Sequence, residues 1–170
     1  HSKDGQQVPV DHIIAGIGII PNTALAAASG VAIGAPETGG GILVDEQLRT
    51  NQPDIYAAGD VASFFDPVRG RYTRVEHEDN AISQGKAAGA NMAGRGAPYT
   101  HQSFFFSDLF DLGYEAVGEL DPRLETYADW VDPYHQGVIY YLKDQLVRGI
   151  LLWNTWGQLQ PARDLLAAGQ

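Results

Sequence analysis

The sequence predicts an α/β region followed by an α+β region that carries an antiparallel sheet. Apolar stretches that end at glycines dominate residues 8–94, which is typical of an α/β layer. Aromatic residues concentrate after residue 100, in stretches typical of successive antiparallel strands. With 170 residues and 44% hydrophobic content, the chain can bury a real core. We place a boundary in RGAPYT, which divides the chain into units 1–98 and 99–170.

The elements of the first unit follow from apolar runs and from the residues that interrupt them. We expect a buried strand over 8–18, a short helix over 21–30, one or two short strands over 39–50, a strand buried on both faces over 54–58, and a helix from near Glu76 to near Gly94. Asn22 or Thr23 can cap the short helix and Gly30 can end it.

The second unit reads as strands followed by one helix. We expect antiparallel strands over 113–120, 124–131, 137–144 and 146–154, and a closing helix over 161–169 with Pro161 in its first turn. The run SFFFSD from Ser103 to Asp108 is interpreted as core. The second unit is therefore predicted to be built on a meander.

Composition excludes several classes of function. The formal charge is −10 and the basic residues are scattered, so we expect no nucleic acid partner. No apolar run approaches the roughly 20 residues that cross a bilayer, so we expect no membrane association and a cytoplasmic location. The absence of cysteine excludes a thiolate nucleophile, an Fe–S cluster and a redox dithiol within this sequence. The start at His1, in what reads as an approach to a strand, indicates a piece of a longer polypeptide.

The stretch TNQPDIYAAGDVA places Gly59 and Asp60 at the end of an apolar segment. Ligands of parallel sheets bind outside the carboxyl ends of the strands, where Gly59 would admit a close approach and Asp60 would offer two acceptor oxygens to sugar hydroxyls. The alternative is that Asp60 caps a short helix starting at Val61. The position of Asp60 in the sequence does not by itself favour either interpretation.

Two other motifs carry weaker signals. GIGIIP, from Gly16 to Pro21, begins like a G-x-G-x-x-G phosphate loop but has proline at the third glycine position, which favours a plain turn. In VEHEDNA, the acids near the expected helix start suit the helix dipole, whereas His77 is not explained in that way. No second His or Cys follows at helical spacing, so the pattern does not favour a metal site.

Taken in order, four segments resemble a known family. They are DHIIAGIGIIPNTALAAASG, GGGILVDEQLRTNQPDIYAAGDVA, RVEHEDNAISQGKAAGANMAG and QSFFFSDLFDLGYEAVGELD. Together they closely resemble the carboxyl-terminal half of FAD-dependent pyridine nucleotide-disulfide oxidoreductases. The resemblance is nearest to the branch of apoptosis-inducing factor and the oxygenase-coupled ferredoxin reductases, and it covers nearly the whole chain. It implies a partial FAD-binding Rossmann-like domain followed by a carboxyl-terminal interface domain.

The resemblance also implies roles for individual residues. Asp60 would lie on the ribityl chain of FAD, next to Gly59, which favours the ligand reading over the helix cap. His77 and Glu78 would lie beside the isoalloxazine. Nicotinamide would be near three further residues, namely Gly18, Glu76 and Glu115. Phe106 stands where apoptosis-inducing factor has tryptophan, and it would stack on a flat ring with less area and no indole N–H.

The implied activity is passage of a hydride from NAD(P)H to FAD and of electrons onward. Glu78 and Asn80 replace histidines of apoptosis-inducing factor, which puts its particular nucleotide affinity in doubt for this chain. No His-Pro motif for a dithiol occurs, so an electron-acceptor protein such as a ferredoxin, or a small molecule, is expected. The phosphate-binding loops of the family lie upstream of the matched segments, so this chain alone should be catalytically silent.

Two alternatives from other classes remain at this point. The aromatic meander of 113–153 can serve as a surface for homodimerisation or for a partner, without activity of its own. A hydrolase using His77 is disfavoured, because the sequence has neither cysteine nor a G-x-S-x-G stretch.

Overall fold

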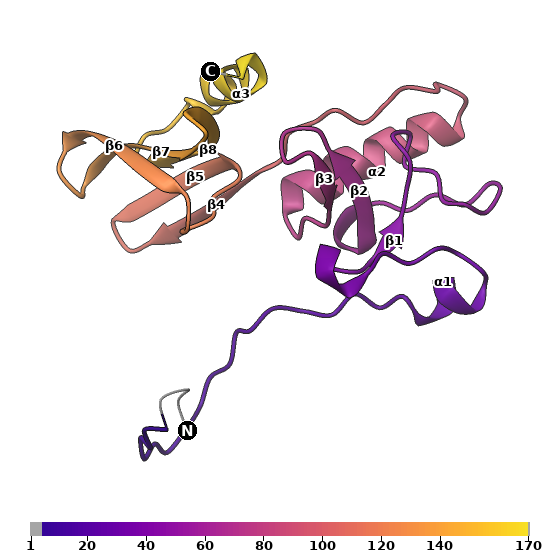
Figure 1. Cartoon of the computed structure of the whole chain (residues 1–170), viewed down its shortest axis with the longest axis horizontal. Helices are drawn as coiled ribbons and strands as arrows, with labels where there is room; N and C mark the ends of the chain where they lie inside the picture. The colour runs from indigo at the N-terminus through magenta and orange to yellow at the C-terminus, as the bar shows by residue number, and fades with distance from the viewer. Residues whose placement is uncertain (1–4, 170) are drawn as a thin grey trace.

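The computed structural model describes residues 5–169 and confirms an α/β unit followed by an antiparallel α+β unit (Figure 1). The first unit contains α1 (Ala24–Ala28), η1 (Pro36–Thr38), β1 (Ile42–Leu43), η2 (Gly59–Val61), β2 (Ala62–Asp66), β3 (Arg71–Thr73) and α2 (Glu78–Met92). The second contains β4 (Phe104–Leu109), β5 (Leu112–Gly118), β6 (Glu125–Asp132), β7 (Gln136–Lys143), β8 (Leu146–Trp153) and α3 (Leu159–Ala168). The strands form a three-stranded and a five-stranded sheet that are separate from each other.

The first unit is a small sheet against which α2 and several loops pack. β1 runs parallel to β2, with Ile42 beside Ala62, and β3 returns antiparallel to β2. Helix α2 contacts the short η2 turn that precedes β2. The apolar core consists of Val44, Leu48, Ala57, Ala62, Phe64, Val75 and Ala88. This core anchors η2 and the start of α2 next to each other.

Two strands expected in the first unit are wrong. No helix or strand is assigned over 5–20, whose side chains are exposed, and Figure 1 shows this segment running away from the rest of the chain. An apolar strand needs neighbours on its edges and faces, and the described residues supply none beside 8–18. The segment 54–58 forms only one bridge, between Arg49 and Tyr56.

The strand after Gly59 and Asp60 was not anticipated either. No α-helix begins at Val61, and η2 has no side-chain cap. The chain instead enters β2, because Ala62 and Phe64 bury their side chains in the core cluster of the first unit. The helix expected from near Glu76 to near Gly94 is present as α2.

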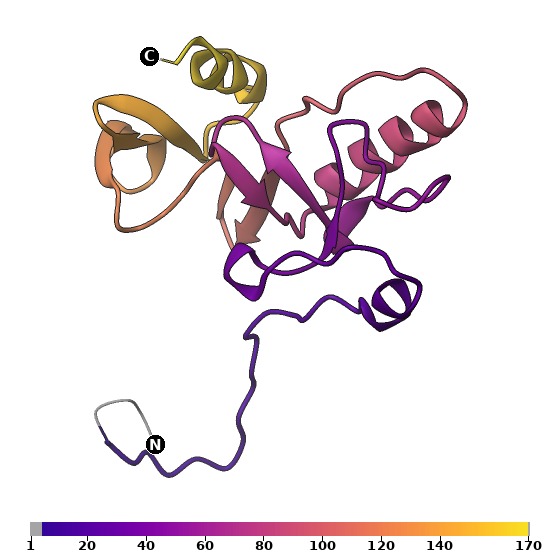
Figure 2. The ribbon, with the colours of Figure 1, turned by 45° about the vertical axis from the view of Figure 1, so that its right-hand side comes forward.

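The second unit is a curled sheet with α3 lying against one of its faces (Figure 2). Its strand order is β4-β5-β8-β7-β6, so β6, β7 and β8 follow one another as in the predicted meander. The prediction is wrong for β5, which pairs with β8 and not with the next strand, β6. The core between sheet and helix is apolar and consists of Val117, Ile150, Leu152, Ala162 and Leu166. Strand β4 contains the run expected to be core, but Phe106 is 56% exposed.

The connection between the units is held against α2. Asn91 donates to the carbonyls of Gln47 and Ala97 and accepts from the amide of Ala97. The Tyr99 hydroxyl lies 2.8 Å from Ser83 Oγ, and burial raises the pKa of Tyr99 to about 12. The two sheets lie on either side of RGAPYT, and the division at residues 98 and 99 stays a prediction.

Within 5–169, no helix combines the length and the apolar character needed to cross a bilayer.

Candidate functional site

A pocket of about 470 Å³ opens between the start of α2 and strand β4. Its lining comes from one short stretch of each unit and consists of Glu76, His77, Glu78, Asp79, Ile82, Phe104, Phe105 and Phe106. Acidic groups and a histidine face aromatic rings across it. This composition suits a flat, partly polar ligand that stacks on one side and accepts or donates hydrogen bonds on the other.

His77 is the residue at which the two walls meet. It is the N-cap of α2, with extended backbone and no side-chain cap hydrogen bond, so its imidazole is free to point away from the helix. Its ring stacks on Phe105, with the centroids 4.5 Å apart and the planes 17° from parallel. Burial, followed by the charge of Arg69, lowers the pKa of His77, so the imidazole is neutral near pH 7.

Gly59 and Asp60 lie on η2, which α2 packs against. Gly59 has φ +77°, which favours glycine, and its amide donates to Gln84 Oε1 at 2.8 Å. Arg74 donates to the backbone oxygen of Asp60 at 2.6 Å, which fixes the turn while the Asp60 side chain stays exposed. The Asp60 carboxylate acts on His77 by partly opposing the lowering of its pKa.

Two of the remaining acids, Glu76 and Glu78, line the same pocket, and the third lies on a neighbouring strand. Glu76 pairs with Arg74 at 2.5 Å, whereas Glu78 is exposed in the first turn of α2. Glu115 lies directly across the ladder from Phe106, on the neighbouring strand β5. Its Oε2 is buried and has no hydrogen-bond partner, which is unusual for a carboxylate oxygen and leaves it available to a donor.

Gly18 is not brought to this site. It has φ +87° and lies within the exposed segment 5–20, where an added Cβ would meet nothing within 4 Å. The structure therefore gathers six of the eight predicted residues at or near the start of α2, places Glu115 on β5 opposite Phe106, and leaves Gly18 apart.

Four lining residues and one supporting arginine were missed as site residues. Phe104 and Phe105 were interpreted as core, Asp79 as a dipole partner, and Ile82 was not considered. Arg74 is 8% exposed in its side chain and bridges Gly39, Asp60 and Glu76. Alternation along β4 could have identified Phe104, since side chains two residues apart on a strand share a face and Phe106 was predicted as a site residue.

Comparison with known proteins identifies the chain. Residues 1–85 match the family model of pyridine nucleotide-disulphide oxidoreductases, and residues 88–133 and 127–168 match the carboxyl-terminal domain model of apoptosis-inducing factor. The chain belongs to the pyridine nucleotide-disulphide oxidoreductase family. This family consists of FAD- and NAD(P)H-dependent oxidoreductases, including enzymes of the ferredoxin reductase type.

The matched relatives cover between two thirds and nearly all of the chain. It is 39% identical to apoptosis-inducing factor 1, mitochondrial, of Dictyostelium discoideum, over 96% of this chain and 32% of the relative. It is 35% identical to putidaredoxin reductase of Pseudomonas putida, over 68% of this chain and 26% of the relative. The crystal structure of the covalent putidaredoxin reductase–putidaredoxin complex matches with a TM-score of 0.82 and 27% identity, over 98% of this chain and 39% of that one. The chain thus spans about a third of the length of these relatives.

The pocket fits the flavin that this family uses. Phe105 and His77 offer parallel ring faces, Phe106 is exposed at the rim, and the unpartnered Oε2 of Glu115 lies one strand away. A Cβ at Gly59 would lie 3.4 Å from Ala81 Cβ, so the glycine lets the turn that carries Asp60 pack closely on α2. These features are a stacking wall, a carboxylate on a glycine turn and a buried acceptor.

Proposed function

We propose that this chain forms the flavin-ring side of an FAD-dependent NAD(P)H oxidoreductase that passes electrons to another protein or to a small molecule. The observation that carries the proposal is the meeting of the start of α2 with the phenylalanines of β4 around one pocket, while η2 packs against α2. A bound FAD would supply the hydride and electron-transfer chemistry. The chain's own residues would bind and orient the flavin and set the charge around it.

We assign some residues to holding the ribityl chain of FAD and others to the surroundings of its ring. Asp60 accepts hydrogen bonds from ribityl hydroxyls, and Gly59 admits their close approach. His77, neutral near pH 7, and Glu78 lie beside the isoalloxazine, while Phe106 offers a stacking surface. Nicotinamide lies near Gly18, Glu76 and Glu115, although Gly18 requires segment 5–20 to take another position.

A ferredoxin is the electron acceptor that we favour. One of the matching crystal structures is a covalent complex of putidaredoxin reductase with putidaredoxin, and several relatives are named ferredoxin reductases. The chain alone should be inactive, because the phosphate-binding loops of the family lie outside the matched segments. The cytoplasmic location stays a prediction.

A chimaera tests the proposal directly. This chain would replace the matching third of the Dictyostelium relative, so that the relative supplies the upstream part. We expect a yellow protein that binds FAD and reduces an artificial acceptor with NADH or NADPH. A chimaera with native circular dichroism but no bound flavin would contradict the proposal.

Two variants of the chimaera separate the assigned roles. Asp60→Ala should weaken FAD binding about tenfold to a hundredfold, which corresponds to roughly 1.5–3 kcal/mol, and should leave the bound flavin reducible. His77→Ala should change the flavin spectrum or its rate of reduction more than its occupancy. FAD titration and stopped-flow reduction measure the two effects. Unchanged FAD affinity in Asp60→Ala would remove Asp60 from the site.

A second candidate function is a homodimerisation or partner-binding module. The observation that favours it is a group of exposed apolar side chains on the second unit, namely Leu109, Phe110, Val131, Tyr134 and Trp156. Light scattering over a range of concentrations tests the homodimer. A monomer at all concentrations would leave only a heterologous partner for this surface.

A further inference from the structure

One carboxylate at the start of α2 gathers three donors from the second unit and the connection to it. Asp79 Oδ2 lies 2.6 Å from His101 Nε2, 3.2 Å from the amide of Phe104 and 3.4 Å from Arg163 Nη2. These partners are 22, 25 and 84 positions away in the sequence. The guanidinium of Arg163 also donates to the carbonyl of Gln102 at 2.9 Å and lies 5.6 Å from the centre of the Phe104 ring. Helix α2, strand β4 and helix α3 are thus tied at a single oxygen atom.

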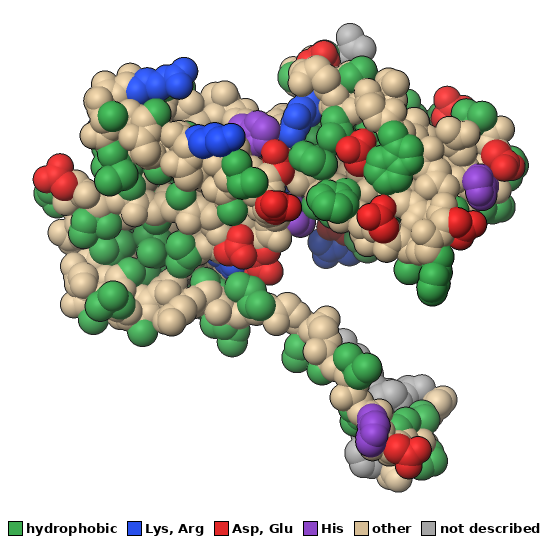
Figure 3. All heavy atoms as spheres, turned by 180° about the vertical axis from the view of Figure 1, so that it is seen from behind, with side chains coloured by type: hydrophobic (Ala, Val, Ile, Leu, Met, Phe, Trp, Pro, Cys, Tyr) green, Lys and Arg blue, Asp and Glu red, His purple; other side chains and the backbone are tan. Residues whose placement is uncertain are grey.

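These contacts of Asp79 with His101, Phe104 and Arg163, called the tie below, lie at the edge of the candidate site. Asp79 follows His77 by two residues, and the amide that it fixes belongs to Phe104, next to Phe105. The stack between His77 and Phe105 spans the same gap as the tie. The distance between the two walls of the pocket is therefore set where Asp79 meets Phe104. Charged and histidine side chains gather at the junction of the two units in Figure 3.

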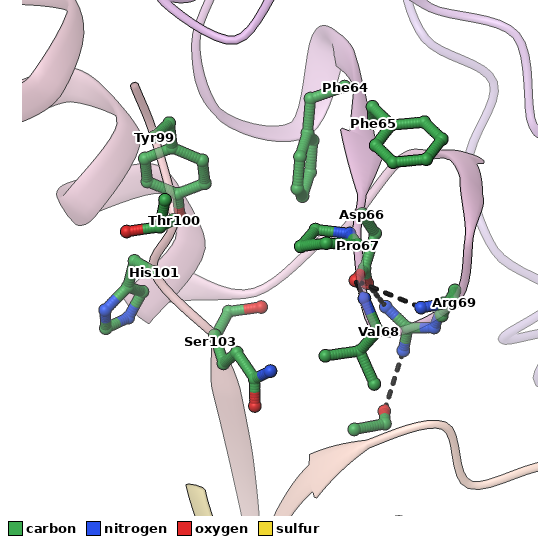
Figure 4. A pocket seen from close by; sticks show the side chains of 12 residues that line it. Phe64, Phe65, Asp66, Pro67, Val68, Arg69, Tyr99, Thr100, His101 and Ser103 are labelled. Carbon is green, nitrogen blue, oxygen red and sulfur yellow. Dashed lines mark hydrogen bonds and ion pairs between the residues drawn. The ribbon is translucent and has the colours of Figure 1, made fainter. Parts of the chain in front are cut away.

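Other contacts hold the two units together away from the pocket. Arg69 pairs with Asp66 at 2.7 Å and donates to the carbonyl of Gly118 at 2.7 Å, beside a hollow of about 30 Å³ (Figure 4). Arg148 donates to the carbonyl of Val68, and Arg71 pairs with Glu119 at 3.0 Å. Loss of Asp79 would therefore leave the units in contact and would free only the aromatic wall.

We propose that Asp79, with His101 and Arg163, is a positioning residue that holds Phe104–Phe106 at a fixed distance from His77. The tie keeps the His77–Phe105 stack closed, so that the two rings together form one aromatic wall of the pocket. The part of this inference that concerns a flavin rests on the proposed function. The part that concerns the stack does not.

Nuclear magnetic resonance on the isotopically labelled 170-residue chain tests the stack without any ligand. In the unaltered chain, we expect nuclear Overhauser contacts between the rings of His77 and Phe105 and a ring-current shift of the His77 protons. Asp79→Ala should abolish both, whereas Asp79→Asn should retain them in part, since an amide oxygen still accepts from Phe104. Arg71→Gln is the matched control: it breaks an ion pair between the units and should leave the stack unchanged.

A titration with flavin mononucleotide then tests the pocket. The unaltered chain should show weak binding through shifts at His77 and Phe105, and Asp79→Ala should weaken it about twofold to tenfold, the range of one aromatic stacking contact. An unchanged stack in Asp79→Ala would overturn the positioning role. If the stack is lost in Asp79→Ala but the chimaera with the Dictyostelium relative binds no FAD, the proposed function fails and the positioning role stands.

A second variant covers the case in which Asp79→Ala does not fold. His101→Ala removes the nearest of the three donors while the carboxylate keeps Phe104 and Arg163. We expect a weakened stack, seen as a smaller ring-current shift of His77 and weaker contacts to Phe105. A His101→Ala chain with the stack of the unaltered chain would then overturn the proposal.

Discussion

The two units of this chain are stabilised in different ways. The second has a five-stranded ladder of hydrogen bonds and an apolar core under α3. The first has a short sheet, and all of the buried polar side chains of the described chain belong to it, namely Ser63, Asn80, Gln84 and Asn91. Three of these side chains, Asn80, Gln84 and Asn91, bond to backbone groups of a kind that strand pairing satisfies in the second unit, whereas Ser63 Oγ has no hydrogen-bond partner.

This difference explains where the site lies. Irregular backbone can place Gly59 and Asp60 against the start of α2, because Gln84 satisfies the amide of Gly59 from within the helix. A regular strand could not make that turn. The second unit contributes the opposite property, since β4 is paired along its whole length with β5 and holds its phenylalanines in a fixed register. The site therefore combines a wall of irregular backbone from the first unit with a wall formed by a fully paired strand of the second.

The largest effect should come from the apolar core of the second unit. Ile150 is 1% exposed, so Ile150→Ala should lower the free energy of unfolding by about 2–5 kcal/mol through lost burial and a cavity. Urea denaturation measures the loss. Leu146→Ala, on the same strand at a position 41% exposed, is the control and should cost much less. Equal losses would mean that burial does not distinguish these positions.

Asn91→Asp probes the polar core of the first unit. A carboxylate cannot donate to the carbonyls of Gln47 and Ala97, so we expect a loss of about 1–3 kcal/mol at about pH 8. Burial would raise the pKa of the new carboxyl above its unfolded value, so the variant should be most stable at low pH and should lose stability as pH rises. Urea denaturation at several pH values tests this. Asn154→Asp, in the second unit, should cost less, because the Asn154 side chain donates to the carbonyl of Asp111 at 3.4 Å, whereas Asn91 donates to two carbonyls at 2.9 Å.

The effect of a glycine-to-alanine change on the free energy of unfolding should depend on the backbone φ angle of the glycine. An added Cβ meets nothing within 4 Å at Gly85 in α2 or at Gly70, but only Gly70 has positive φ, at +64°. Gly85→Ala should therefore raise the free energy of unfolding by about 0.5–1 kcal/mol. Gly70→Ala should lower it by about 1 kcal/mol, because the left-handed conformation is strained for alanine. Thermal denaturation compares them, and effects of the same sign would refute this account.

The smallest expected effect is electrostatic and lies at the seam of the two units. His77 should titrate below its ordinary pKa of about 6.5, because burial and Arg69 disfavour its charged form. The unfolded chain then binds the proton more readily, so stability should fall as pH drops below about 6.5, and His77→Gln should flatten that slope. Asp60→Asn should lower the pKa of His77 further, since the Asp60 charge opposes the shift. Titration of the His77 ring protons measures this pKa in the unaltered chain and in Asp60→Asn. A higher His77 pKa in Asp60→Asn would contradict the prediction.

The sequence by itself determined the elements that local patterns dictate. Helix α2, helix α3 and strands β5 to β8 lie where periodicity and turn residues predicted them. The order of the motifs identified the family, and their residues placed His77 and its acidic neighbours at a helix start. These features depend on neighbours within a few positions, which is why the linear chain reveals them.

Tertiary structure decided what depends on distant partners. The apolar run of 8–18 has strand composition but no strand beside it, and the residues after Asp60 became β2 because β1 and β3 lie on either side. The pairing of β5 with β8 and the meeting of Asp79 with His101, Phe104 and Arg163 join residues far apart in the sequence. Local propensity carries no information on such pairs, since their energy is gained only when the rest of the fold brings them together.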